Sequence, residues 1–251
     1  MKIYRFLDGG RVAIGVEDGE RIVRYTGRDA AALGQATSHA ISRDAAELLP
    51  PVVPTKIVAV GRNYAEHAKE LGNEAPSEPI IFLKPPSALL PPNGTIIRPP
   101  QSQRVDFEGE LAIVIGKTAR NIAAANWRTV VLGFTCANDV TARDLQKKDV
   151  QFTRGKSFDT FCPLGPCIET DLDPSALSLR TRVNGEVKQN GNTRDMVFNC
   201  GAIIEFITSV MTLEPGDVIL TGTPAGVGPL APGDRVEVEI EGIGVLQNVV
   251  A

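Results

Sequence analysis

Residues 105–116 read VDFEGELAIVIG. Asp106, Glu108 and Glu110 alternate with other residues, and a strand with a period of two would place their carboxylates on one face, about 7 Å apart. The apolar run LAIVI (111–115) shows no alternation, which indicates a strand covered on both faces. Acidic side chains at the mouth of such a strand lose hydration and repel one another. The stretch therefore predicts a buried strand in a large core, with a positive group or a cation among its acids.

A second alternating acidic stretch near the C-terminus provides a comparison. In RVEVEIEG (235–242), Glu237, Glu239 and Glu241 alternate with apolar residues. This is the pattern of a half-exposed strand with a solvated acidic face. Alternating glutamates alone are therefore a weak indicator of a metal site. The first stretch differs because its apolar run occupies both faces directly after the acids.

Composition narrows the class of protein. The 251 residues suffice for one large domain or a domain with a small appendage, and 43% hydrophobic residues support a sizeable core. A net charge of −4 and the lack of a basic stripe argue against a nucleic-acid partner. No apolar run approaches the ~18 residues that a membrane span needs, and the first residues show no apolar signal segment. Four cysteines without a C-x-x-C pair are typical of a reduced, cytoplasmic protein.

The N-terminal fifty residues differ in pattern from the rest of the chain. Residues 1–27 predict a short β-meander with glycine-containing turns, and two alanine-rich stretches, 29–35 and 42–49, are expected to be helical. The segment PPVVP (50–54) then interrupts any regular element. We therefore expect a small N-terminal domain over residues 1–53.

Residues 54–251 are expected to form the main domain. Apolar runs and period-two alternation predict strands over most of it, and helices are few. The best helix candidates are the segment that ends at Gly72, TARDLQKKD (141–149) and AIIEFITSVM (202–211). The predicted fold class is therefore α+β, rich in strands.

Histidine is scarce, which narrows the choice of metal. Only His39 and His67 occur, so a histidine-rich zinc, copper or iron site is nearly excluded. Carboxylate ligands favour hard cations, here Mg²⁺ or Mn²⁺, with Ca²⁺ as a less favoured choice.

His67 has a potential carboxylate partner close by in the sequence. His67 and Glu70 are three residues apart in NYAEHAKE and would share one helix face. A carboxylate on one imidazole nitrogen fixes the tautomer and raises the basicity of the other nitrogen, as in a general base. The alternative is a solvated pair on a surface helix, which the spacing alone favours.

The segment ANDVTARDLQ (137–146) contains a second group of polar residues. Asp139 follows an apolar strand, and Arg143 and Gln146 lie on a predicted helical turn after it. Asp139 is either the N-capping residue of an exposed helix or a third metal ligand. In the second case Arg143 and Gln146, three apart, would face the same site and suit a substrate carboxylate.

Motifs of other enzyme classes fail on spacing or context. The GKS at 155–157 lacks the first glycine of a phosphate-binding loop, since Val150 stands there, and GTPAGVG (222–228) leads into another turn and not into a helix. No G-x-S-x-G occurs. Cys162 lies in a proline-bounded turn, which favours a core residue over a nucleophile.

Seven segments occur in the order found in the fumarylacetoacetate hydrolase family, and together they resemble it far more specifically than any one does. They are GRNYAEHAKELG, FLKPPSALL, VDFEGELAIVIGK, ANDVTARDLQ, GKSFDTFCPLGP, VNGEVKQNGNT and LEPGDVILTGTPAGVG. The first fifty residues are similar to the small N-terminal domain of bacterial members. The resemblance implies a mixed β-sandwich roll, usually a homodimer, with a divalent cation in a cleft.

The resemblance also implies which acids hold the cation. Glu108, Glu110 and Asp139 match the positions at which the family holds its metal. A bound cation would supply the positive charge that acids beside a buried strand need. Asp106 is expected to lie behind the ligands or to be solvated.

Other roles follow from the same resemblance. His67 and Glu70 match the general-base dyad of the family, on a segment that behaves as a lid. Lys156 would add positive charge where an oxyanion develops. The positions that match substrate-facing residues are Arg62, Arg143, Gln146, Lys156 and Thr223, and Lys84 lies in a matching motif.

Two departures narrow the expected activity. The fumarylacetoacetate hydrolase of tyrosine breakdown is much longer, and it has a tyrosine where this chain has Val150. The chain resembles more closely the small bacterial members, acylpyruvases and oxaloacetate decarboxylase-like proteins. We therefore expect a metal-dependent hydrolase or decarboxylase of small 2,4-dioxo acids, such as acylpyruvates and oxaloacetate.

Two alternative functions stay open at this point. One is an isomerase or tautomerase of 2-hydroxy-diene diacids, of the 2-hydroxyhepta-2,4-diene-1,7-dioate or 5-carboxymethyl-2-hydroxymuconate type. The other is a non-catalytic protein that binds a metal or an oxo acid. The acids together with His67 and Glu70 argue against the second, because a binding protein has no need of a base.

Overall fold

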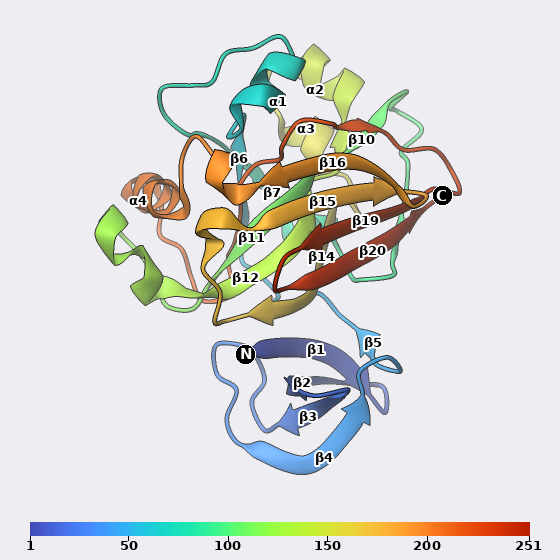
Figure 1. Ribbon diagram of the computed structural model, residues 1–251, viewed down its shortest axis with the longest axis vertical. Helices are drawn as coiled ribbons and strands as arrows, with labels where there is room; N and C mark the ends of the chain where they lie inside the picture. The colour runs from blue at the N-terminus through green and yellow to red at the C-terminus, as the bar shows by residue number, and fades with distance from the viewer.

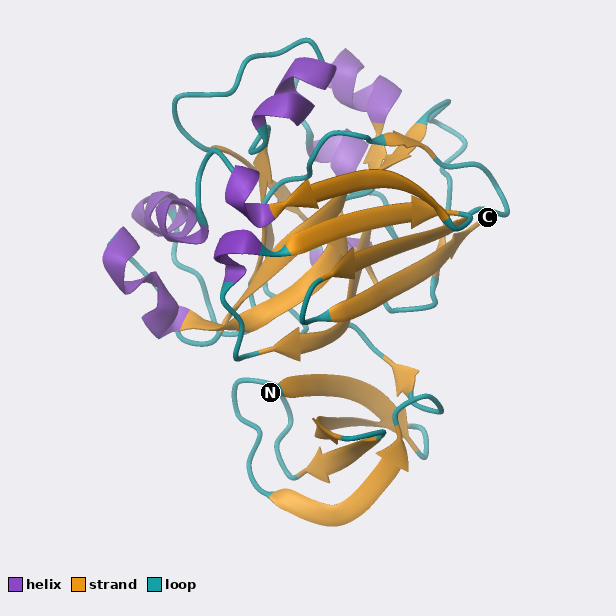
Figure 2. Ribbon diagram, in the orientation of Figure 1, coloured by secondary structure: helices purple, strands orange, loops and turns teal.

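Strands dominate the structure, a computed structural model that describes residues 1–251 (Figures 1 and 2). In Figure 1 a small group of N-terminal strands lies below a larger body, which contains the other strands and every helix. This arrangement confirms the predicted strand-rich α+β class. None of the helices combines the length and the apolar character that a membrane-spanning helix requires.

The N-terminal strands form the meander that the turn residues predict. They pair antiparallel in chain order, as β1 (Lys2–Asp8), β2 (Arg11–Asp18), β3 (Arg21–Tyr25) and β4 (Ala36–Ser42). The two tight turns have φ angles of +57° at Gly9, +75° at Gly10 and +61° at Gly19. Glycine adopts such angles without strain, which explains its place in both turns.

The helices expected at 29–35 and 42–49 are wrong. In the first stretch the Asp29 carboxylate accepts the backbone N–H of Ala32 (2.9 Å), a local bond that competes with helix formation. The second stretch contains β5 (Glu47–Leu48), which pairs with β1. Segments this short nucleate helices poorly, so tertiary pairing decides their structure.

The strand β1 also joins the N-terminal meander to the main sheet. Lys2 and Ile3 pair with Glu169 and Ile168, so one path of paired strands runs from β4 through β1 into the larger body. The path continues through β14 (Cys162–Glu169), β12 (Val131–Asn138), β11 (Gly109–Ile115), β17 (Val218–Leu220), β6 (Ile57–Gly61) and β7 (Ile80–Lys84). Because β6 and β17 are parallel and the other neighbours on the path antiparallel, the sheet is mixed. The sequence patterns did not predict β14.

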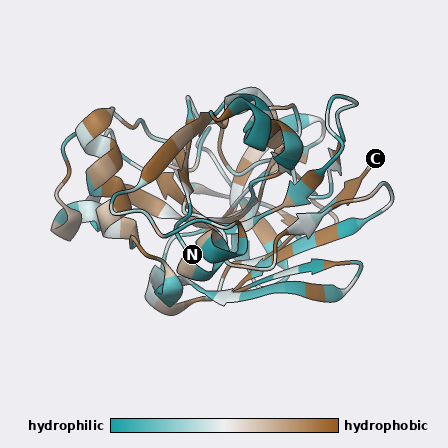
Figure 3. Cartoon of the chain, turned by 90° about the horizontal axis from the view of Figure 1, so that it is seen from above, coloured by the Kyte–Doolittle hydropathy of each residue, from teal (hydrophilic) through white to brown (hydrophobic).

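A second sheet packs against the main sheet. In spatial order its strands are β16 (Glu186–Asn192), β15 (Ser178–Val183), β19 (Arg235–Ile240), β20 (Gly244–Val250) and β9 (Thr95–Ile96). Buried residues of this sheet, such as Leu179 and Val238, belong to one hydrophobic cluster with Leu111 and Ile113 of β11. Figure 3 shows hydrophobic and hydrophilic residues alternating along the outer strands. The buried β11 and the half-exposed β19 both confirm their sequence patterns.

Short elements complete the larger body. A third small sheet contains β13 (Thr141–Ala142), β10 (Val105–Phe107) and β18 (Gly228–Pro229), and β8 (Leu89–Leu90) pairs with β14. The α-helices are α1 (Ala65–Glu70), α2 (Arg143–Asp149), α3 (Thr153–Lys156) and α4 (Cys200–Val210). The 3₁₀ helices are η1 (Pro86–Ala88), η2 (Ala124–Val130), η3 (Pro174–Ala176) and η4 (Thr193–Asp195). In Figure 1, α1, α2 and α3 lie together at the end of the larger body that is farthest from the N-terminal strands.

The carboxylate of Asp217, directly before β17, binds the two residues that directly precede β6. This buried carboxylate accepts the backbone N–H groups of Thr55 (2.9 Å), Lys56 (3.1 Å) and Glu214 (2.8 Å), and it forms an ion pair with Lys56 Nζ. Burial alone would raise the pKa of Asp217. The hydrogen bonds and the ammonium of Lys56 outweigh burial and hold this pKa below its ordinary value.

We expect Asp217→Ala to lower the free energy of unfolding by about 3 kcal/mol, because it leaves a lysine and several backbone donors without their partner. A carboxylate with a depressed folded pKa stabilises the fold above the ordinary Asp pKa of about 3.9, and this contribution is lost as the pH falls through the folded pKa. Urea unfolding of both proteins at pH 7 and below pH 4 measures the difference. The difference should narrow in acid, and a difference that is independent of pH would contradict this role of Asp217.

Candidate active site

The alternating acids do not lie on one continuous strand. Pairing breaks at Glu108, because β10 belongs to the small third sheet whereas β11 pairs with β12 and β17 in the main sheet. Glu108 N donates to Asn138 Oδ1 (2.9 Å), and the Glu108 carbonyl accepts the N–H of Asp139 (2.8 Å). The break therefore brings Glu108 beside Asp139, at the end of β12.

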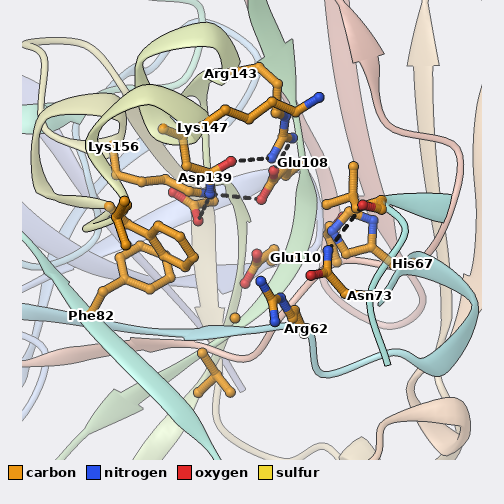
Figure 4. Close-up of a pocket in the computed structure, with 17 residues that line it drawn as sticks. Arg62, His67, Asn73, Phe82, Glu108, Glu110, Asp139, Arg143, Lys147 and Lys156 are labelled. Atoms are coloured by element: carbon orange, nitrogen blue, oxygen red, sulfur yellow. Dashed lines mark hydrogen bonds and ion pairs between the residues drawn. The ribbon is translucent and has the colours of Figure 1, made fainter. Parts of the chain in front are cut away.

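Glu108, Glu110 and Asp139 converge as the sequence predicts (Figure 4). One carboxylate oxygen from each lies within 4.8 Å of the others. The three side chains are almost fully buried, with exposed fractions of 4%, 2% and 1%. Buried carboxylates this close together need compensating positive charge.

Cationic side chains bind two of the three acids. Lys156 Nζ donates to Glu108 Oε2 (2.8 Å) and to Asp139 Oδ2 (2.6 Å), and Lys84 Nζ donates to Asp139 Oδ1 (2.6 Å). Arg143 Nη2 donates to Glu108 Oε1. Both lysines are themselves almost fully buried. Lys84, which lies only in a matching motif in the sequence, is thus a direct partner of Asp139.

Glu110 is the member of the cluster without a cationic partner. Burial raises the pKa of Glu110 well above its ordinary value, and the carboxylates of Asp139 and Glu108 raise it further. Glu108 behaves in the opposite way: burial would raise its pKa, but Lys156 and Arg143 together outweigh burial and hold the pKa of Glu108 below its ordinary value. Negative charge is therefore compensated on one side of the cluster and not on the other.

This donor set fits a divalent cation. Three buried carboxylates converge without a histidine or cysteine among them, and such oxygen donors suit Mg²⁺, Mn²⁺ or Ca²⁺. Positive charge beside Glu110 would offset the repulsion that raises its pKa. The chemistry of the donors therefore agrees with the cations expected from the sequence.

His67 lies in the same site with Glu70 as its partner. The two residues lie on α1, and His67 Nδ1 is 3.2 Å from Glu70 Oε2. His67 is 5% exposed, so the alternative of a solvated surface pair is wrong. With Nδ1 facing the carboxylate, Nε2 is the ring nitrogen that can exchange a proton with a bound molecule.

The glycine-rich segment GTPAGVG (222–228) holds Glu70 in place. The backbone N–H of Gly226 donates to Glu70 Oε1 (3.0 Å). Only glycine suits this position, because its φ is +102° and a Cβ atom would overlap the Lys188 carbonyl oxygen. The segment that fails as a nucleotide-binding motif therefore positions the carboxylate partner of His67.

Arg143 is fully engaged with neighbouring side chains. Its Nε donates to Asp106 Oδ2 (2.9 Å), its Nη1 to Gln146 Oε1 (2.7 Å) and its Nη2 to Glu108 Oε1. Asp106 is fully buried and also accepts Arg104 Nε (2.8 Å), so it lies behind Glu108 and is not solvated. Arg143 and Gln146 face the site as predicted, but the guanidinium of Arg143 is occupied in fixing Glu108.

Thr223 and Arg62 also line the site. The Thr223 hydroxyl donates to the Gly109 carbonyl (2.8 Å) and accepts Gln189 Nε2 (2.7 Å), so its hydrogen bonds are satisfied within the protein. Arg62 has a φ of +57°, which non-glycine residues rarely adopt. Backbone strain of this kind persists where the surrounding structure imposes it, often at functional sites.

All of the predicted site residues except Glu70 line one cavity of about 340 Å³ (Figure 4). Several other lining residues were not predicted: Val60, Leu71, Asn73, Phe82, Lys147 and Phe152. Val150 also lines the cavity, at the end of α2, with a φ of +65° and 84% exposure. The cavity is thus lined both by charged residues and by several apolar ones.

The cysteines take no part in the site. All four are free and buried, and burial raises the pKa of Cys162 to about 12. A thiol with such a pKa stays protonated at neutral pH and is a poor nucleophile. The structure therefore confirms Cys162 as a core residue.

The fold and the site define a strand-rich α+β protein with a buried carboxylate cluster suited to a divalent cation and a histidine–glutamate pair beside it. The family model of the fumarylacetoacetate hydrolase C-terminal domain matches residues 56–251, and a Rv2993c-like N-terminal family model matches residues 1–51. The chain belongs to the fumarylacetoacetate hydrolase family, whose members are enzymes.

Relatives of known name and solved structures agree with this membership. Oxaloacetate tautomerase FAHD2A, mitochondrial, of Homo sapiens is 48% identical over 215 residues, which are 81% of this chain and 68% of that protein. The structure of 5-carboxymethyl-2-hydroxymuconate delta-isomerase from Mycobacterium smegmatis has a TM-score of 0.93 and 44% identity, covering 100% of this chain and 99% of that one. Fumarylacetoacetate hydrolase from Exiguobacterium antarcticum has a TM-score of 0.90 and 41% identity with the same coverage.

Proposed function

We propose that this protein is a divalent-cation-dependent enzyme that forms the enolate of a small 2-oxo acid with a carbonyl or carboxyl group at C4. The first reaction we propose is keto–enol tautomerisation of such an acid, with oxaloacetate as the substrate to test. One observation carries the proposal: the buried base His67 and the acid cluster with Lys156 line the same cavity.

The chemistry follows from the residues of the cavity. When bound by Glu108, Glu110 and Asp139, a divalent cation supplies a Lewis acid for the 2-oxo group. Keto and enol forms differ only in whether one proton is on C3 or on the 2-oxygen. His67 Nε2 can take that proton and return it, while Glu70 stabilises the imidazolium, so that no water is consumed.

Lys156 gives the developing negative charge a fixed positive neighbour. Its ammonium is held by Glu108 and Asp139. Burial alone would lower the pKa of Lys156, but these two carboxylates outweigh burial and raise it, so the side chain stays charged at neutral pH. A charge that is already oriented before the reaction needs no rearrangement in the transition state.

The names of the relatives support proton transfer as the first reaction, ahead of the bond cleavage that we expect from the sequence. A tautomerase and an isomerase are among the proteins most similar to this chain. Cleavage of a C–C bond is the second candidate, because structures named as hydrolases also match the whole chain. In a hydrolase the same His67 would activate water for attack on the C4 carbonyl.

Product analysis separates the two reactions. Oxaloacetate and acetylpyruvate would be incubated with the protein and Mg²⁺ or Mn²⁺, with parallel measurement of the ultraviolet absorbance of the enol and of the pyruvate formed. We expect enol and keto forms of oxaloacetate to interconvert without release of pyruvate above the cation-only rate. Stoichiometric pyruvate from either acid would replace the tautomerase proposal with hydrolysis or decarboxylation.

A further inference from the structure

Lys147 lines the cavity without a partner of its own. The buried cations beside the acids, Arg143, Lys156 and Lys84, are all bound to carboxylates, whereas Lys147 is exposed at the edge of the cavity. The side chain of Lys147 forms no hydrogen bond or ion pair within the chain, although it lines the cavity. Its ammonium is therefore available to an anion in that cavity.

The position of Lys147 on α2 explains why it faces the site. Residues four apart lie on one face of a helix, so Lys147 lies one turn beyond Arg143 on the side that contains the acids. Figure 4 shows both side chains on the same side of the site. Lys148, the next residue, does not line the cavity.

The acids of α2 are not available to neutralise Lys147. Asp144 accepts hydrogen bonds from Ser102 Oγ (2.6 Å) and from Gln103 N (2.9 Å), and Asp149 is bound by Arg154. Lys147 thus gains no ion pair within the protein, and its charge stays available to a ligand.

We propose that Lys147 binds the distal carboxylate of the substrate and makes the site selective for a dicarboxylate over a monocarboxylate of similar size. This inference rests on the proposed function, because it names the class of acid within it. Arg143 cannot take this role while its three donor nitrogens hold Asp106, Gln146 and Glu108. Arg62 is the other cavity cation without a bonded acid, and Figure 4 draws it on the side of the site away from Arg143 and Lys147.

Substitution of neighbouring lysines tests this assignment. Lys147→Gln removes the charge and keeps the helix, and Lys148→Gln is the matched control on the same helix. For each variant, kcat/KM would be measured for oxaloacetate, which has two carboxylates, and for acetylpyruvate, which has one. Lys147→Gln should lower the ratio of the two values at least tenfold, and Lys148→Gln should change it less than twofold. An unchanged ratio in Lys147→Gln, or an equal change in both variants, would overturn the assignment.

A binding measurement separates this inference from the proposed function. If the wild type turns over neither acid, the proposed function has failed, and calorimetric titration of oxaloacetate into the Mg²⁺-loaded protein decides the role of Lys147. Affinity at least tenfold weaker in Lys147→Gln than in Lys148→Gln would support it, and equal affinities would refute it. Thermal unfolding provides the control for folding, because substitution of an exposed lysine without an ion pair should leave the melting temperature of Lys147→Gln close to that of the wild type.

Discussion

Glu108→Gln and Asp139→Asn are each expected to abolish tight binding of Mg²⁺ and Mn²⁺ and, with it, turnover. Loss of a residue behind a metal ligand typically costs 10- to 100-fold in affinity, so loss of a ligand should cost more than about 10²-fold. Each variant also leaves the Lys156 ammonium with one carboxylate in place of two. Calorimetric titration of each cation into the purified protein measures the loss.

The half-exposed strand β19 offers a matched control for these variants. Glu237→Gln makes the same chemical change at an alternating glutamate that is remote from the cavity lining. It should bind Mg²⁺ as the wild type does. The assignment of the ligands is wrong if Glu108→Gln or Asp139→Asn remains fully active after chelation and dialysis.

His67→Ala should lower turnover by about 10²-fold or more, in line with what general acid–base catalysis contributes. The only side-chain hydrogen bond of His67 is the one to Glu70. His67 forms no hydrogen bond with any of the three clustered acids. Steady-state kinetics would measure the loss of turnover. The same variant should keep its affinity for Mg²⁺ in calorimetry.

The only other histidine supplies the control. His39 lies in the N-terminal meander and pairs with Asp8 (3.1 Å), so His39→Ala removes an imidazole without touching the site. Turnover of His39→Ala should match the wild type. Loss of Mg²⁺ affinity in His67→Ala would make His67 a ligand and remove it as the base.

The sequence predicts the parts of the fold in which local pattern and environment agree. The run LAIVI is buried on both faces in β11, and the glycine turns of the meander have the positive φ angles that they require. Sequence patterns do not predict the segments whose structure is decided by pairing with strands distant in the chain. The alanine-rich stretch 42–49 contains a short strand because β1 lies beside it, and β14 contains two prolines that conceal a central strand of the sheet.

The sequence and its family resemblance predict which acids converge, but not which side chains bind them. Glu108 and Glu110 at the start of a buried strand indicate a cluster, and the resemblance to the family adds Asp139 as its third member. The sequence cannot say that Arg143 binds Asp106 and Glu108, because those contacts join segments 35 or more residues apart. Gln189, which donates a hydrogen bond to Thr223, lies 34 residues before it in the chain. Lys147 could have been found from its spacing of four from Arg143 on the predicted helix.

In the proposed reaction, Glu108, Glu110 and Asp139 hold a cation beside His67, which moves the C3 proton of a 2-oxo acid. Stopped-flow absorbance after adding enol oxaloacetate from an aprotic solvent tests it most directly, in four conditions: wild type and His67→Ala, each with Mg²⁺ and with a chelator. We predict that decay of the enol exceeds the rate without protein only for the wild type with Mg²⁺. Equal acceleration by the chelated wild type, or by His67→Ala with Mg²⁺, would contradict the proposal.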